Sequence, residues 1–302
     1  YCTQPQGDED YTLPQLRAAY ARSDAELQSD YDAQWARLDA AEPLTDEVYD
    51  EIYLAMSLDE AVLTQRETVR SYPDYVRSLR ETADACGIVC NQAHAPFASS
   101  TGDESDDRRR FDAIVRSIEA AAMLGAKTIV VHPKQHLPYT TCKEALFDMN
   151  VEFYRTLVPY CEQFGIKVAC ENMWQYNKAA GRIIDSTCSR PEEFCAYLDA
   201  VDSPFVVACL DIGHAGLTDE DLPHFVRTLG KKRLQALHVH DNDLHGDDHM
   251  LPFTRKFDFA AFTAALSDIG YAGDFTFEAD NFLVPFPQPL HAEAARFMCS
   301  VG

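Results

Sequence analysis

Four short apolar segments of the sequence end abruptly on residue types that bind metal ions. The segments are residues 167–171 (KVACE), 206–211 (VVACLD), 237–243 (LHVHDND) and 274–278 (DFTFE). Charge is unusual at a buried strand end, because an ion removed from water is costly unless it is paired or neutralised. Four such ends therefore predict a ring of ligands around a cation, formed by Glu171, Asp211, His238 and Glu278.

The composition of this ring indicates which ions it would hold. Three carboxylates and one imidazole suit a hard or borderline divalent ion, so that Mn²⁺, Zn²⁺, Mg²⁺ and Co²⁺ are all compatible. We expect one ion from these four residues, and up to three if neighbouring histidines also bind metal. The alternative is that the segments are unrelated strand ends whose acids are solvated.

Other histidines and one acid are expected at the same rim. They are His94, His132, His214, Asp247 and His249. A lone histidine is more often a structural group than a ligand. The shared position of His94, His132 and His214 at the carboxyl ends of strand-like runs favours substrate binding or additional metal binding instead. Asp247 and His249 lie in the loop after the run that contains His238.

Three further residues are predicted to touch substrate. Lys134 is placed to hold a hydroxyl or phosphate as a point charge, with a solvated loop lysine as the alternative. Trp174 and Phe97 would form an apolar wall for a sugar ring, although rim aromatics are also common packing residues. His240 either supports a ligand by hydrogen bonding or faces the helices. The remaining histidines are expected at the surface: His136, His224, His245 and His291.

From residue 87 onward, strand-like and helix-like segments alternate. Strands are predicted over 88–94 and 127–132, and helices over 107–124, 143–164 and 259–269. Residues 189–192 resemble a capping box, and 218–221 an N-cap. Strands joined by helices pair in parallel, and the expected ligands all lie at carboxyl strand ends, where barrel loops carry active sites. The sequence therefore predicts an α/β fold, a (β/α)8 TIM barrel, with six recognisable repeats.

The first 86 residues fit this pattern least, because they are almost wholly helical over 13–38 and 46–70. An eight-stranded barrel needs two more strands, and residues 52–58 and 1–3 are the available segments. We therefore expect one barrel domain over 1–302. It would comprise a mostly helical part over 1–86, βα repeats over 87–282 and a C-terminal helix within 283–302.

Composition excludes several classes of protein. The formal net charge of −23 repels polyanions, so nucleic acid is not an expected partner. No apolar run reaches the roughly 18 residues of a membrane span, and residues 1–6 (YCTQPQ) do not resemble a secretory signal. The ten cysteines include no Cys-x-x-Cys pair. We interpret them as reduced thiols and expect a cytoplasmic protein.

Residues 87–282 resemble the xylose isomerase-like barrel superfamily, which includes ketose 3-epimerases, inosose dehydratases, hydroxypyruvate isomerase-type enzymes and endonuclease IV-type enzymes. The resemblance lies in the order of six motifs: His94-Ala-Pro-Phe, Val131-His-Pro, Glu171-Asn-Met, Asp211-Ile-Gly-His, His238-Val-His-Asp-Asn and Phe277-Glu. In the sugar-converting members, positions matching Glu171, Asp211, His238 and Glu278 hold one divalent ion. The histidine matching His214 contacts substrate there.

The resemblance implies a metal-dependent isomerase or epimerase of a small sugar or sugar phosphate. It would work through an enediolate stabilised by the ion, with Glu171 and Glu278 as acid and base. A homodimer is expected from family habit alone.

The endonuclease IV-type members imply an alternative, a multi-zinc phosphodiesterase. Three zinc ions are held there, and the additional ligands correspond to His94, His132, His214, Asp247 and His249. All of these are present here. The acidic charge opposes this alternative, as does the absence of a basic residue between Asp247 and His249. A third hypothesis is a sugar-binding barrel that has lost its chemistry.

Overall fold

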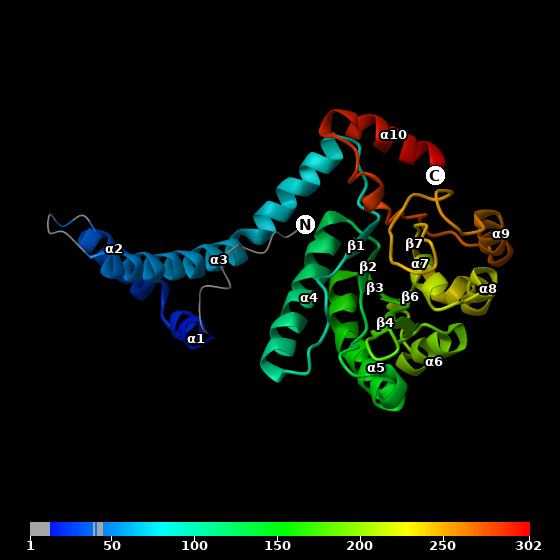
Figure 1. Ribbon diagram of the computed structural model, residues 1–302, viewed down its shortest axis with the longest axis horizontal. Coiled ribbons are helices and arrows are strands. Elements are labelled where there is room, and N and C mark those ends of the chain that lie inside the picture. The colour runs from blue at the N-terminus through cyan, green and yellow to red at the C-terminus, as the bar shows by residue number, and fades with distance from the viewer. Residues whose placement is uncertain (1–12, 39, 41–44) are drawn as a thin grey trace. The chain divides into compact units, whose positions relative to one another are not determined.

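The computed structural model describes residues 13–38, 40 and 45–302 (Figure 1). The chain divides into two compact units, with the boundary between Ser78 and Leu79. The segment 1–3, considered above as a strand, lies outside the described residues.

The N-terminal unit is helical. Helices α1 (Leu13–Ala21) and α2 (Asp24–Leu38) are followed by α3 (Asp46–Ala85), which runs past the boundary. The prediction of a strand over 52–58 is wrong, because this segment lies within α3. Ile52 and Met56, one helical turn apart, are both buried, whereas Leu54 is 37% exposed. A strand would have placed all three side chains on one face.

The second unit contains a curled parallel sheet. Its strands are β1 (Gln92–His94), β2 (Thr128–Val131), β3 (Lys167–Glu171), β6 (Val206–Asp211) and β7 (Leu234–His238). They pair in the order β1-β2-β3-β6-β7, and a parallel bridge from Val239 to Phe277 adds a sixth segment. The described residues thus form a half-barrel of the TIM-barrel type, which confirms the predicted fold class.

Helices connect successive strands and follow one another around the sheet (Figure 1). They are α4 (Glu104–Leu124), α5 (Tyr139–Phe164), α6 (Pro191–Val201), α8 (Leu222–Arg233) and α9 (Phe259–Ile269). Short helix α7 (Ile212–Leu217) follows β6 directly. The 3-10 turns η1 (Asp280–Phe282) and η2 (Gln288–Leu290) precede α10 (His291–Val301), which lies in the predicted C-terminal region.

The N-terminal ends of α6 and α8 can be compared with the two capping predictions. Asp221 caps α8 by accepting a hydrogen bond from the backbone N–H of His224, as predicted. The capping box over 189–192 is wrong. Arg190 occupies the N-cap of α6 without a side-chain bond, and the Ser189 hydroxyl accepts from the Ser186 N–H instead. Pro191 at the first helical turn has no N–H to satisfy, so the helix begins there without a side-chain cap.

Small apolar residues fill the inside of the curled sheet: Val130, Ala169, Val207, Cys209 and Ala236. A larger cluster packs the helices against its outer face. Both layers stop at the carboxyl ends of the strands, where polar residues begin. An antiparallel hairpin that was not predicted, β4 (Trp174–Asn177) with β5 (Arg182–Asp185), rises from the loop after β3. Within the described segments, no helix has the length and apolar character needed to cross a bilayer.

Candidate metal centre and active site

Four predicted ligands meet at the carboxyl ends of neighbouring strands. Glu171, Asp211 and His238 are the last residues of β3, β6 and β7, and Glu278 follows the bridge residue Phe277. The sheet register places Asp211 directly beside His238. One ligand atom from each of the four residues lies within 4.8 Å of all the others.

The distances within this group fit a single ion. His238 Nδ1 lies 2.9 Å from Glu278 Oε2, 3.4 Å from Glu171 Oε1 and 3.8 Å from Asp211 Oδ2. Ligands bound at about 2.1 Å lie up to about 4.2 Å apart across one ion, so small side-chain adjustments suffice. His238 Nδ1 and Glu171 Oε2 are both buried, and despite these short distances no described residue meets either atom with the geometry of a hydrogen bond. A cation would satisfy both atoms, whose burial is otherwise costly.

The electrostatics of the site favour positive charge. Burial alone would raise the pKa of Glu171, but the neighbouring His238 and His132 imidazoles hold it well below its usual value. Burial would lower the pKa of His214, but Asp211, Asp247 and Glu171 raise it to about 10. Imidazoles that carry protons in this cluster must release them to bind metal.

A second group of ligand types lies beside the first. His240, Asp247 and His249 offer ligand atoms within 4.8 Å of one another. Asp247 Oδ2 accepts a hydrogen bond from Trp174 Nε1 at 3.3 Å and lies 3.2 Å from His214 Nε2. The structure thus brings together His214, Asp247, His249 and Trp174, all of which the sequence placed at this rim.

The remaining predicted histidines, His94 and His132, lie at the ends of β1 and β2. His132 Nε2 lies 3.1 Å and His94 Nε2 3.5 Å from Glu171 Oε2. The Phe97 ring stacks on His132 with centroids 4.8 Å apart and is largely exposed. Phe97 therefore adds an apolar ring to the site beside His94 and His132.

Lys134 is not brought to this cluster. Its ammonium lies 5.2 Å from the centroid of the Phe153 ring, and its backbone is hydrogen bonded on both sides to the Asn150 amide. Within the part of the chain that the structure describes, no hydrogen bond or ion pair joins Lys134 to the proposed ligands. Asn150 of α5 holds the loop that carries Lys134, and the Lys134 side chain is turned toward α5. The sequence pattern did not reveal this contact.

One supporting residue was missed, and a second had been left with two possible roles. The buried Asn172 amide donates to the Asp211 carbonyl at 2.9 Å and accepts from the Asp211 N–H at 2.8 Å, which fixes the end of β6 against β3. His240 Nε2 lies 3.1 Å from Asp211 Oδ1, so His240 supports a predicted ligand, one of the two roles considered for it. The adjacency of Asn172 to Glu171 was the available sequence signal.

Gly213 makes room for His240, because a Cβ atom at this position would overlap the His240 ring. We expect Gly213→Ala to lower the free energy of unfolding by about 1–3 kcal/mol, the usual cost of overpacking a filled site. Urea denaturation measures this change. The matched control is the double variant with His240→Ala, which removes the obstructing ring and should be no less stable than His240→Ala alone. Wild-type stability of Gly213→Ala would contradict the packing argument.

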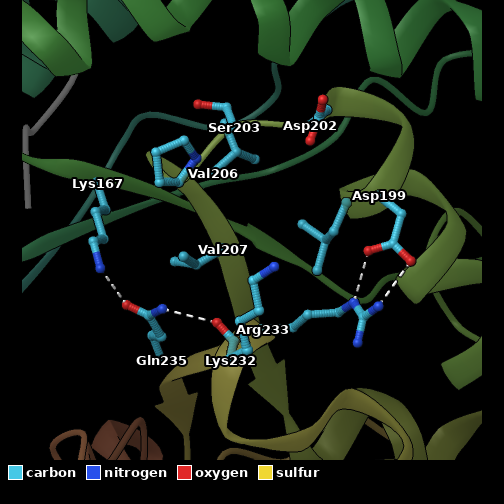
Figure 2. Close-up of a pocket in the computed structure, with 11 residues that line it drawn as sticks. Lys167, Asp199, Asp202, Ser203, Val206, Val207, Lys232, Arg233 and Gln235 are labelled. Carbon is cyan, nitrogen blue, oxygen red and sulfur yellow. Dashed lines mark hydrogen bonds and ion pairs between the residues drawn. The ribbon is translucent and has the colours of Figure 1, made fainter.

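A hollow at the opposite ends of the strands has different chemistry. It lies where β3, β6 and β7 begin, beside Lys167 and Val206, and Figure 2 shows Lys167 donating to Gln235 and Arg233 paired with Asp199. Its charged groups are therefore partly engaged with one another. The ligand-type residues gather at the other face, where TIM barrels carry active sites.

A family model described as a xylose isomerase-like TIM barrel matches residues 55–301 of the chain. The fructoselysine 3-epimerase of Shigella flexneri is 26% identical over 200 residues, which cover 66% of this chain and 69% of that protein. A probable endonuclease 4 of Metamycoplasma arthritidis is 28% identical over 189 residues, covering 59% and 64%. The chain is thus similar to proteins named for two different chemistries.

Solved structures share the fold. A D-tagatose 3-epimerase-like protein superposes with a TM-score of 0.59 and 23% identity, covering 76% of this chain and 85% of that one. A structure described as the IOLI protein with a binding zinc atom gives a TM-score of 0.60 and 18% identity, covering 78% and 85%.

Proposed function

The chain belongs to the xylose isomerase-like TIM barrel family, and from that premise we propose that it is a divalent-metal-dependent isomerase or epimerase of a sugar or sugar phosphate. The fructoselysine 3-epimerase and the D-tagatose 3-epimerase-like protein support the sugar class. The zinc atom in the IOLI structure supports a metal in this fold.

One observation carries the proposal: Glu171 and Glu278 converge on the same imidazole nitrogen from different strands. Their oxygens lie 3.4 and 2.9 Å from His238 Nδ1. Glu171 is buried, whereas the Glu278 side chain is 30% exposed. Two carboxylates in such unlike surroundings, both close to one imidazole nitrogen, suit proton removal by one and proton return by the other.

The residues of the chain would divide the reaction as follows. The chemistry that a divalent ion supplies, when held by Glu171, Asp211, His238 and Glu278, is polarisation of a carbonyl, which acidifies the neighbouring C–H. Glu171 and Glu278 then act as base and acid. His214 binds substrate oxygens, with its Nδ1 held 2.8 Å from the Asn172 carbonyl. Removal of the C3 proton of a 2-ketose and its return to C3 on the other face gives the C3 epimer, whereas removal of a C1 proton and return of a proton to C2 gives an aldose.

Solvent exchange tests this proposal. We expect the metal-loaded protein in D₂O to incorporate deuterium at C3 of a ketose such as D-fructose or D-tagatose, with the C3 epimer accumulating, as followed by NMR. Deuterium at C1 or C2 with aldose formation would identify an isomerase. Absence of exchange at every carbon in a panel of free and phosphorylated ketoses, at full metal occupancy, would contradict the proposal.

The alternative is a multi-zinc phosphodiesterase. It is favoured by the second ligand group, His240, Asp247 and His249, by the approach of His94 and His132 to Glu171, and by the probable endonuclease 4 relative. The net charge of −23 opposes a polyanionic substrate. Metal stoichiometry separates the two proposals.

A further inference from the structure

An open cavity of about 540 Å³ lies next to the proposed metal centre. Its walls come from the β4–β5 hairpin, the end of α7 and the loop after β7. Trp174 and Asp247 line this cavity and also belong to the site, where Asp247 lies 3.2 Å from His214. A molecule bound at the proposed ligands would therefore extend into this cavity if it were larger than a simple sugar.

Most of the cavity wall is apolar. Tyr176 and Ile183 face it from the hairpin, and Leu217 and Leu244 from the other side. Tyr176 is 56% exposed and Leu244 41% exposed, so both present carbon atoms to solvent. Sugar hydroxyls gain little from such surfaces, whereas an apolar substituent is stabilised by covering them.

Two charged residues line the cavity, and they differ in whether they are paired: Asp247 has partners and Arg182 has none among the described residues. Asp247 is already hydrogen bonded to Trp174 and paired with His214 and His249. Arg182, on the hairpin, has no side-chain hydrogen bond or ion pair to any of the residues for which the structure gives a position. Arg182 also borders a neighbouring hollow, where Arg190 is neutralised by Asp185 and Glu220. Among the described residues, Arg182 is thus an unpaired cation at the border of this cavity, in a strongly acidic chain.

We propose that the substrate is a ketose bearing an apolar substituent that ends in a carboxylate, with the sugar at Glu171 and Glu278, the substituent in this cavity and the carboxylate on Arg182. This inference rests on the proposed function and specifies its substrate class. A guanidinium binds a carboxylate through two parallel hydrogen bonds, a geometry that a neutral end group does not match. The aromatic and aliphatic walls supply the surface that the substituent covers.

Trp174 provides a readout of binding that is independent of turnover. The chain has two tryptophans, and Trp35 lies in the N-terminal unit, 53% exposed. In a Trp35→Phe background, fluorescence therefore reports the Trp174 environment. The probes are the 1-O-carboxypentyl ether of D-fructose and its carboxamide, whose apolar chains end in a carboxylate and in a neutral amide respectively.

We expect the carboxylate probe to bind roughly 10-fold more tightly than the carboxamide, as for an exposed charge-assisted pair. Arg182→Gln should reduce this preference to about one by weakening carboxylate binding, with the carboxamide unaffected. Arg227→Gln, which removes an exposed arginine of α8 that pairs with Asp268 of α9, is the matched control and should keep the preference. Leu244→Ala should weaken both probes equally.

Two results would overturn the inference: equal binding of the two probes to the wild-type site, or a preference that survives Arg182→Gln. Solvent exchange of free D-fructose reports on the proposed function separately. Probe binding with the expected preference but no exchange at any ketose carbon would refute the isomerase and epimerase chemistry while leaving the cavity assignment in place.

Discussion

Glu171→Gln and Glu278→Gln are each expected to lower ketose turnover by about 10²- to 10⁴-fold, the usual contribution of one positioned acid–base group. The amide preserves the shape of the side chain but neither accepts nor returns a proton at neutral pH. Initial rates by NMR, at saturating metal, measure the loss. If each glutamate serves one face, each variant should still exchange the C3 proton of one epimer with solvent and fail on the other.

Both glutamates are also proposed ligands, so metal content must be measured for each variant. Glu192→Gln is the matched control, because Glu192 is an exposed acid at the start of α6 and pairs with His224. It should leave turnover unchanged. Wild-type activity in both Glu171→Gln and Glu278→Gln would rule out their role as base and acid.

Removal of metal is expected to destabilise the second unit and abolish turnover. A ligand that binds the folded state at 100 to 1,000 times its dissociation constant stabilises it by about 3–4 kcal/mol. Chelation should therefore lower Tm by several degrees, and Mn²⁺, Co²⁺ or Zn²⁺ should restore it. Elemental mass spectrometry should give about one divalent ion per chain, because one group combines three carboxylates with an imidazole.

Two variants identify where that ion binds. His238→Ala should lose the ion, whereas His249→Ala should keep it, because His249 belongs to the second ligand group. Two to three zinc ions per chain, with loss of at least one in His249→Ala, would contradict the single-ion proposal and favour the phosphodiesterase. An unchanged Tm after complete removal of metal would contradict a stabilising ion.

The strand ends were the most predictable part of the molecule. Parallel strands joined by helices must end at one edge, so apolar runs stopping at Glu171, Asp211 and His238 predicted their meeting point. The sequence was less informative where long side chains or local loops decide the outcome. The β4–β5 hairpin has no clear alternation, and the direction of Lys134 depends on hydrogen bonds between its backbone and the Asn150 amide, which is distant in sequence.

The N-terminal error has a different cause. Residues 52–58 combine bulky apolar residues with strong helix formers, and periodicity over one short window does not separate a buried helix from a strand. The longer context decides, because Ile52, Met56 and Val62 are all buried in one helix. His240 was ambiguous for a similar reason: its role follows from the position of Asp211 across the sheet, which no local pattern encodes.

The segment carrying Glu278 is attached to the sheet by few bonds. Val239 donates to the Thr276 carbonyl at 2.9 Å, and Glu278 donates through its N–H to the Val239 carbonyl at 3.1 Å. An ion shared by Glu278 and the residues of β3, β6 and β7 would hold the last repeat to the rest of the sheet. Release of the metal and separation of this repeat from the sheet would then occur together. The lifetime of the bound ion would measure how often the sheet edge opens.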